Sequence, residues 1–325
     1  MIATGQTWGG VPGILVETDV LRVSIIPAAG AKLHELIHRP TGFDLLWKNP
    51  RVPLRATYPG PNFDDVWSGG WDELFPTDPA CTVGDTSFHD HGDLWHGPWE
   101  WEVTRDDGAA AEIHLSRYTV ALPCLVEKWI GFERGSHAIE FRHRITNLGH
   151  GPIDFDWSLH VAHAIAPGSR VHMAPEGLRA EPDQAGRFAA APELIGWPRH
   201  GDIDVGAAPP PRSGLLEWLH PRGLREGWCA VTHPAQGVGL GLEFDRDVFR
   251  TVWIWGVYGG WRGHYVLLTE PSTSPPGGLA RNVANGTAAR LEGQGVLETR
   301  VRAVVLDDID PAAPGDRRPG SWEGR

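Results

Sequence analysis

The chain has 325 residues, a formal net charge of -12 at pH 7 and 41% hydrophobic residues. This charge argues against nucleic acid or an anionic membrane surface as the main partner, because both recruit clustered Lys and Arg side chains. No stretch approaches the ~18 consecutive apolar residues of a membrane span, and the first residues lack the pattern of a secretory signal. Three widely spaced cysteines predict neither a disulfide framework nor a CxxC metal motif. We therefore expect a reduced, cytoplasmic protein.

Two features of the composition bear on fold and ligand. The 41 Gly and 28 Pro residues suit many turns and few long helices. The chain also has 16 Trp against 4 Tyr. Trp packs well on the apolar faces of sugar rings, but it is equally a large core residue, so both uses stay open at this point.

In chain order, the dominant pattern is an alternation of apolar and polar residues between turn residues, which predicts strands. Asp107-Gly108 is typical of a tight hairpin turn, because Gly supplies the positive φ that the turn needs. No segment shows convincing helical periodicity with caps. Strands are expected over residues 20–27, 32–38, 43–47, 99–104, 111–119, 126–133, 138–145, 153–164, 238–244, 249–257, 264–269 and 295–305.

The rest of the chain is less regular. Residues 178–223 are rich in Pro, Gly and Ala and predict a long insertion with short strands, since apolar residues continue on either side. We expect one large antiparallel, all-β domain over residues 1–310 and a loose C-terminal tail over residues 311–325.

Histidines cluster in residues 88–99. His89, His91 and His96 fall within eight residues, and imidazole is a common metal ligand. A cupin-like metal site would also need a Glu a few residues later, where Trp95 and His96 stand. Metal binding and a polar loop both fit this segment.

A second segment, residues 154–163, predicts a strand with two different faces. One face is polar and the other apolar, which indicates a core on one side and either a polar cleft or plain solvent on the other. The polar face holds Asp154, Asp156, Ser158 and His160, and the apolar face holds Phe155, Trp157, Leu159 and Val161.

A third segment, residues 264–279, carries Glu270 at the end of an apolar strand and directly before Pro271. Such a position can lie at the floor of a cleft, where burial raises the pKa of a carboxyl group and makes it a better base. A surface Glu at a strand end is the alternative.

Taken together, these segments resemble the galactose mutarotase-like superfamily, which includes the aldose 1-epimerases. The resemblance rests on four motifs in order, spread between about residues 20 and 305. They are Gly69-Gly70-Trp71-Asp72-Glu73-Leu74-Phe75-Pro76, His91-Gly92, Trp157-Ser158-Leu159-His160 and Leu267-Leu268-Thr269-Glu270-Pro271. The resemblance implies a β-supersandwich with an open sugar-binding cleft, Glu270 as general base, His160 as general acid and His91 as a second histidine.

These residue types suit anomer interconversion. Opening a hemiacetal requires deprotonation of the anomeric hydroxyl and protonation of the ring oxygen, which a carboxylate and an imidazole can do together. The reaction needs no redox cofactor and no metal. The expected partner is a small-molecule sugar, and the absence of an obvious Arg cluster favours an unphosphorylated one.

The sequence departs from the best-known members of the superfamily. Residues 88–90 do not match the Asn-rich stretch that precedes their histidine, so the resemblance is to a less-studied branch and leaves the substrate open. The alternative functions are a mutarotase-fold protein that only binds sugar, an isomerase or epimerase acting at another carbon, and a metal-dependent cupin-like enzyme.

Further side chains are expected to contact the sugar. Trp253 and Trp255 share one strand face, which is either the cleft or the core. The predicted substrate-binding residues are Trp71, Asp72, Glu73, Trp95, His96, Asp156 and Trp255.

Overall fold

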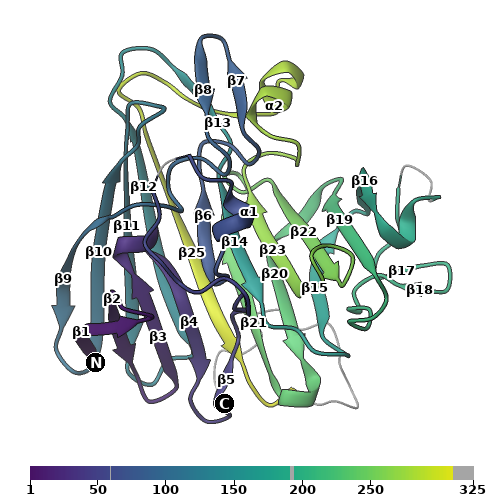
Figure 1. The fold of residues 1–325 in the computed structure, drawn as a ribbon, viewed down its shortest axis with the longest axis horizontal. Helices are drawn as coiled ribbons and strands as arrows, with labels where there is room; N and C mark the ends of the chain where they lie inside the picture. Colours follow the sequence, from purple (N-terminus) through teal and green to yellow (C-terminus); the bar gives the residue numbers. More distant parts are fainter. Residues whose placement is uncertain (59, 191–193, 310–325) are drawn as a thin grey trace.

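The computed structural model describes residues 1–58, 60–190 and 194–309. Two large sheets dominate this part of the chain, and every strand pair in them is antiparallel (Figure 1). The all-β prediction is therefore confirmed. The predicted tail over residues 311–325 lies outside the described residues.

The first sheet has 11 strands and carries the pocket described below. In spatial order they are β1 (Ile2–Trp8), β2 (Val11–Glu17), β3 (Leu21–Ile26), β4 (Lys32–His38), β6 (Trp71–Leu74), β14 (Ser158–His163), β23 (Tyr265–Ser272), β22 (Thr251–Tyr258), β19 (Leu215–Pro221) and β16 (Leu178–Ala185), and β5 (Phe43–Asp44) pairs with β4 off this path.

The second sheet has eight strands. Their order is β15 (Arg170–Pro175), β20 (Leu224–His233), β21 (Val238–Phe244), β25 (Val296–Leu306), β12 (Ala138–Asn147), β11 (Cys124–Glu133), β10 (Ala110–Tyr118) and β9 (Glu100–Asp106).

Small elements complete the described chain. Three two-stranded sheets pair β13 (Ile153–Phe155) with β24 (Ala289–Leu291), β17 (Arg199–His200) with β18 (Ile203–Asp204), and β7 (Cys81–Val83) with β8 (Thr86–Phe88). The two α-helices are α1 (Phe63–Val66) and α2 (Leu279–Asn285). β7, β8 and α2 gather at one end of the sheets (Figure 1). No helix in the described ranges is long and apolar enough to cross a membrane.

The two large sheets bury a shared apolar core. Residues of both sheets belong to one cluster of buried side chains, including Ile25 and Leu159 from the first and Ile130 and Phe141 from the second. β11 shows how the sequence produces this layer, since its residues alternate between buried and half-buried along the strand. Such alternation gives each sheet one apolar face to pack against the other.

Most predicted strands are present, but one prediction is wrong. Residues 153–164 do not form one strand, because the chain leaves β13 at Phe155 and enters β14 at Ser158, in a different sheet. Between them, the Asp156 amide donates to Pro76 O (2.9 Å) and the Trp157 amide donates to Thr273 Oγ1 (2.9 Å). These two bonds hold the segment between β13 and β14, where the chain passes from one sheet to another. In the predicted insertion, β16 and β19 join the large sheet.

Candidate active site

A pocket lies over one face of the 11-stranded sheet and encloses about 730 Å³ of empty space that is partly open to solvent. Its floor comes from four neighbouring strands, and its walls come from α1, the end of β16 and several loops. The floor residues are His160 of β14, Glu270 of β23, Trp253 and Trp255 of β22, and Leu216 and Trp218 of β19; the walls include Phe63, Asp64, Trp67, Asp78, Asp90, His91, Gln184 and Trp261.

A row of polar side chains crosses this face of the sheet. Asp72 of β6 pairs in register with His160 of β14. The register of β14 and β23 sets His160 opposite Glu270. Glu270 in turn pairs with Trp253 of β22. Side chains directly opposite on neighbouring strands have Cβ atoms about 5 Å apart. Glu270 and His160 are therefore side by side on the pocket floor rather than facing each other across the cleft.

Glu270 is buried, with an exposed fraction of 3%. Burial raises the pKa of its carboxyl group well above the ordinary value, and the negative charge of Asp78 raises it further. Asp78 is also buried, and desolvation raises its own pKa to about 6 against the opposing charge of His91. The pocket thus holds two carboxyl groups that retain protons more strongly than ordinary ones.

The backbone at His91 is held in an unusual conformation. His91 has φ 59° and Gly92 has φ 69°, the left-handed region. The Gly92 position requires glycine, because a Cβ there would lie 2.0 Å from Phe75 O. The His91 amide donates to Asp78 O (2.5 Å). These contacts fix the loop against the end of β6 and turn the imidazole into the pocket.

Carboxylates surround the His91 side chain. Its Nδ1 lies 3.0 Å from Asp90 Oδ1 and its Nε2 lies 3.6 Å from Asp78 Oδ1. Burial opposes the charged imidazole, but the hydrogen bond to Asp90 and the charges of Asp78, Asp90 and Asp64 outweigh it and raise the pKa of His91. The ring also stacks on Phe63, with centroids 3.9 Å apart. These acids therefore favour the protonated form of His91.

His160 has the opposite environment. The edges of Phe63 and Trp67 enclose its ring, each with a centroid distance of 5.3 Å. Desolvation lowers the pKa of His160 well below its ordinary value, and the positive charges of His91 and Lys32 lower it further. His160 is therefore a neutral imidazole at neutral pH.

Tryptophans form the apolar side of the pocket. Trp253 and Trp255 both line it, so their shared strand face is the cleft face. Trp255 donates its Nε1–H to Gln184 Oε1 (2.7 Å), and Trp261 packs against it edge-on at 5.2 Å. Trp253 donates its Nε1–H to Ser274 O (2.8 Å) and contacts Trp218 at 5.9 Å. Trp253 is fully buried, whereas the half-buried rings of Trp255 and Trp261 offer flat apolar surfaces beside the acids of the pocket.

Solved structures match this fold. A candidate aldose 1-epimerase from Klebsiella pneumoniae subsp. pneumoniae MGH 78578 superposes with a TM-score of 0.74 at 15% identity, over 97% of this chain and 84% of that one. A galactose mutarotase-like protein from Clostridium acetobutylicum gives a TM-score of 0.65 at 12% identity, over 94% and 98% of the two chains. The fold is that of the galactose mutarotase-like proteins.

A third structure shares this mutarotase-like fold over its whole length. The Slr1438 protein from Synechocystis sp. PCC 6803 gives a TM-score of 0.67 at 17% identity, over 94% of this chain and 100% of that one. No protein-family model and no curated protein matches the sequence. At these identities the likeness concerns the fold, and the resemblance found in the sequence motifs is confirmed at that level.

Within this mutarotase-like fold, the structure brings four of the predicted site residues together. His91, His160, Trp255 and Glu270 all line the pocket. The other predicted residues, Trp71, Asp72, Glu73, Trp95, His96 and Asp156, do not line it.

Asp72 belongs to the polar row but is closed off from the pocket. Its side chain is fully buried and forms an ion pair with Lys32 Nζ at 3.1 Å. Lys32 also donates to Gly69 O (2.9 Å) and to Ser68 Oγ (3.2 Å). Desolvation raises the pKa of Asp72, and Lys32 opposes that rise. The pair places a positive charge next to the His160 position and supports the floor from one side.

Glu73 and Trp71 point to the other face of β6, into the core between the sheets. Glu73 accepts from Lys128 Nζ (3.0 Å), His143 Nε2 (3.3 Å) and Trp157 Nε1 (3.2 Å). Burial favours the neutral carboxyl, but Lys128 and His143 outweigh it and lower its pKa. Trp71 packs on Phe141 at 4.9 Å. These two predicted residues therefore face the core and not the pocket, because consecutive residues of a strand face opposite sides.

The remaining three predicted residues lie behind the pocket walls. Trp95 packs edge-on against Phe63 at 4.9 Å and donates to Asp90 O (3.1 Å), so it supports the wall instead of forming it. Asp156 accepts from Asn282 Nδ2 (2.8 Å). His96 is fully buried, and desolvation together with Arg117 lowers its pKa to about 4.

Several pocket residues were missed from the sequence. Phe63 and Trp67 belong to or follow the one-turn helix α1, and Asp78 lies in a loop. None of them falls in a periodic segment, so no local pattern marks them. Trp218 and Gln184 come from the segment predicted as an insertion, where only the presence of a Trp was a signal.

The histidine cluster does not form the alternative metal site. His89 is exposed, His96 is buried elsewhere, and only His91 lines the pocket. Across the described ranges, the one group of three or more His, Cys, Asp or Glu side chains with converging ligand atoms is His38, His137 and Asp307, outside this pocket.

Proposed function

We propose that the protein is an aldose 1-epimerase-type isomerase that interconverts the anomers of a free sugar bound in this pocket. The observation that carries the proposal is the pair formed by Glu270 and His160. The two lie on neighbouring strands of the pocket floor, and burial shifts their pKa values in opposite directions. Environments that shift the pKa values of two neighbouring groups in opposite directions are typical of general acid–base sites.

Ring opening of the sugar needs two proton transfers. One group removes the proton from the anomeric hydroxyl, and another protonates the ring oxygen as the bond between C1 and that oxygen breaks. Rotation about the C1–C2 bond in the resulting open-chain aldehyde, followed by the reverse transfers, closes the ring with the opposite configuration. Positioned acids and bases accelerate such steps by about 10²–10⁴-fold each.

The pKa directions assign the resting place of the shared proton. A raised pKa favours protonated Glu270 and a lowered pKa favours neutral His160. In this state Glu270 gives its proton to the ring oxygen while His160 accepts the proton of the anomeric hydroxyl. Opening thus converts the pair to carboxylate and imidazolium, and closing restores it. During ring closure the roles are reversed, so Glu270 acts as the base and His160 as the acid, as the sequence motifs imply.

His91 supports this pair in the proposed mechanism. Its positive charge lowers the pKa of His160, so the pair holds one proton rather than two. The rings of His91 and His160 are edge-on, with centroids 5.9 Å apart. His91 Nε2, which lies 3.6 Å from Asp78 Oδ1 and beyond hydrogen-bond distance, also offers a hydrogen bond to a sugar oxygen.

The lining favours a neutral sugar. Among the described residues that line the pocket there is no Lys or Arg, while Asp64, Asp78, Asp90 and Glu270 are acids. Carboxylates accept hydrogen bonds from sugar hydroxyls and repel a phosphate or a sugar acid. The half-buried ring of Trp255 suits the C–H face of a pyranose.

Polarimetry tests the proposal. Freshly dissolved aldoses, including deoxy sugars, are followed with and without the protein, and sugar phosphates serve as the unfavoured class. We expect at least one neutral aldose to reach its equilibrium rotation faster in proportion to protein concentration. Binding of aldoses without any acceleration would reject catalysis and favour a sugar-binding protein of the same fold.

A further inference from the structure

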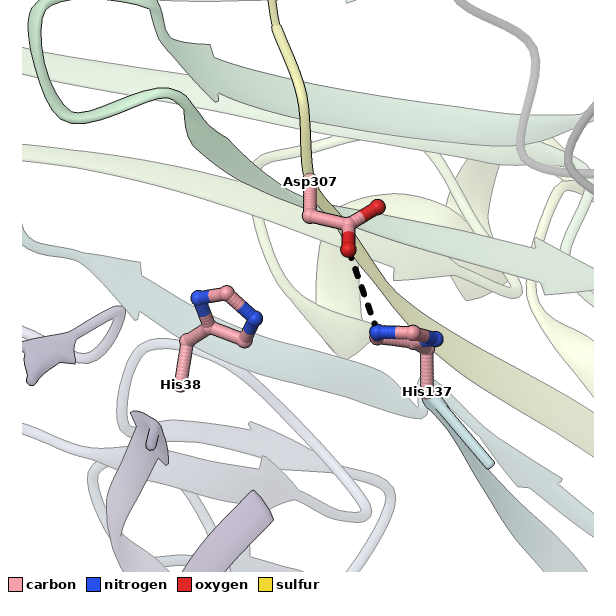
Figure 2. A group of neighbouring side chains, drawn as sticks. All are labelled: His38, His137 and Asp307. Atoms are coloured by element: carbon pink, nitrogen blue, oxygen red, sulfur yellow. Dashed lines mark ion pairs between the residues drawn. The ribbon is translucent and has the colours of Figure 1, made fainter. Parts of the chain in front are cut away.

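A second cluster of chemically active side chains lies away from the pocket, where the two large sheets meet. His38 ends β4 of the first sheet, His137 directly precedes β12 of the second, and Asp307 directly follows β25. Figure 2 shows the three side chains converging on one point between the sheets. Their ligand atoms all lie within 4.8 Å of one another.

His38 has a free nitrogen aimed at this point. Its ring is buried, with 2% of the residue exposed. The Thr41 hydroxyl donates its proton to His38 O (3.4 Å), so Thr41 Oγ1 is left to accept a hydrogen bond from His38 Nδ1 at 3.0 Å. Nδ1 therefore carries the proton and Nε2 carries a lone pair. Within the described chain Nε2 has no hydrogen-bond partner, and it points toward His137 and Asp307 (Figure 2).

An unpaired polar atom in a buried position destabilises the fold, because it has lost its hydrogen bonds to water without gaining others. A metal ion removes that destabilisation, and the Thr41 contact matches the second-shell hydrogen bond that orients metal-binding histidines. His137 Nε2 lies 3.2 Å from Asp307 Oδ2. Ligand atoms of a tetrahedral zinc site, each about 2.0–2.2 Å from the ion, are roughly 3.3–3.6 Å apart. His137 and Asp307 are already close to that spacing, and the ligand atom of His38 lies within 4.8 Å of both.

We propose that His38, His137 and Asp307 bind one divalent first-row transition-metal ion, for which two imidazoles and a carboxylate are a suitable donor set, with water at the fourth position. The ion ties the end of β4 in one sheet to β12 and β25 in the other, so its role is structural. It is separate from the pocket, because none of these three residues lines the pocket.

Zinc binding by the full, untagged chain tests this site. The chain is dialysed against buffered Zn²⁺, bound metal is counted by mass spectrometry, and thermal unfolding is recorded with and without the ion. We expect one zinc ion per chain and a higher Tm with zinc, since a ligand that binds only the folded state stabilises it. Asp307→Asn and His137→Ala, both at partly exposed positions, should keep the fold and weaken zinc binding by at least about tenfold.

His150→Ala is the matched control, because His150 is an exposed histidine outside the cluster. It should bind zinc as tightly as the wild type and show the same rise in Tm. A wild-type chain that binds no zinc would overturn the proposal. So would a bound zinc ion whose affinity is unchanged in Asp307→Asn and His137→Ala, since the ion would then sit elsewhere, for example at the pocket histidines.

Discussion

His160 and Glu270 occupy opposite positions on β14 and β23, and burial moves the pKa of the imidazole down and that of the carboxyl group up. The two shifts have one physical origin, since each group loses hydration of its charged form. Together they favour a pair with a single proton and no net charge. That arrangement suits a substrate without charge and a reaction that only relocates protons.

Glu270→Gln should abolish most of the proposed activity while leaving sugar binding intact. Gln keeps the size of the side chain and removes the group that exchanges a proton. We expect kcat for mutarotation to fall by about 10²–10⁴-fold, measured by polarimetry, with the sugar Kd from calorimetry changing little.

Glu298→Gln provides the control for that variant, because Glu298 is an exposed carboxylate on β25 of the other sheet. It should keep wild-type kcat. Wild-type rates in Glu270→Gln would show that Glu270 carries no catalytic proton.

Asp78→Asn should shift the pH dependence of the reaction. The active pair holds one proton, so kcat/KM falls at low pH when His160 becomes protonated and falls at high pH when Glu270 loses its proton. The charge of Asp78 raises the pKa of Glu270, and removing it lowers that pKa. The high-pH limb of the profile should therefore move to lower pH. A limb that stays in place or moves upward contradicts the assignment.

The sequence predicts the sheet framework well because alternation is a local signal. β4 and β21 have the expected bounds of residues 32–38 and 238–244. It predicts the site less completely, since the pocket joins distant loops to the sheet. Asp78 and His91 meet through a loop contact at 3.6 Å, and neither lies in a periodic segment.

The position of Glu73 has a local explanation. The motif Trp71-Asp72-Glu73 reads as a run of ligand-contacting side chains, but a strand turns alternate residues to opposite faces. Asp72 lies on the face of β6 that carries the polar row with His160, whereas Glu73 lies on the opposite face, in a buried charge cluster. If this four-residue strand is predicted, alternation along it places Asp72 and Glu73 on opposite faces.

We therefore expect Lys128→Met to lower the free energy of unfolding without affecting the pocket. Lys128 is buried and compensates Glu73 at 3.0 Å, and removing one partner of a buried pair costs about 3–5 kcal/mol. Urea unfolding measures the loss of stability. The double variant Glu73→Gln/Lys128→Met should lose less, because no unpaired charge remains.

Arg134→Met is the surface control for that experiment. Arg134 pairs with Asp19 at 3.3 Å, but both side chains are mostly exposed, so we expect a loss below about 1 kcal/mol. Equal losses in Lys128→Met and Arg134→Met would show that the Glu73 cluster contributes no more than a surface ion pair.

Trp255→Ala should weaken sugar binding by about tenfold, because the ring supplies apolar contact area that the sugar covers. The measurement is a calorimetric titration with the sugar found active by polarimetry. Trp101→Ala is the control, since Trp101 is 43% exposed on β9 of the other sheet. Unchanged affinity in Trp255→Ala would place the sugar away from the tryptophan wall.

Exchange NMR on an equilibrium mixture of sugar anomers tests the central claim most directly. Saturation of one anomeric proton is transferred to the other only if the anomers interconvert on the timescale of the experiment. With chelator present, we predict transfer for at least one neutral aldose with the wild-type protein and none above background with Glu270→Gln. Bound sugar without transfer in the wild type, or equal transfer in both proteins, would contradict the account.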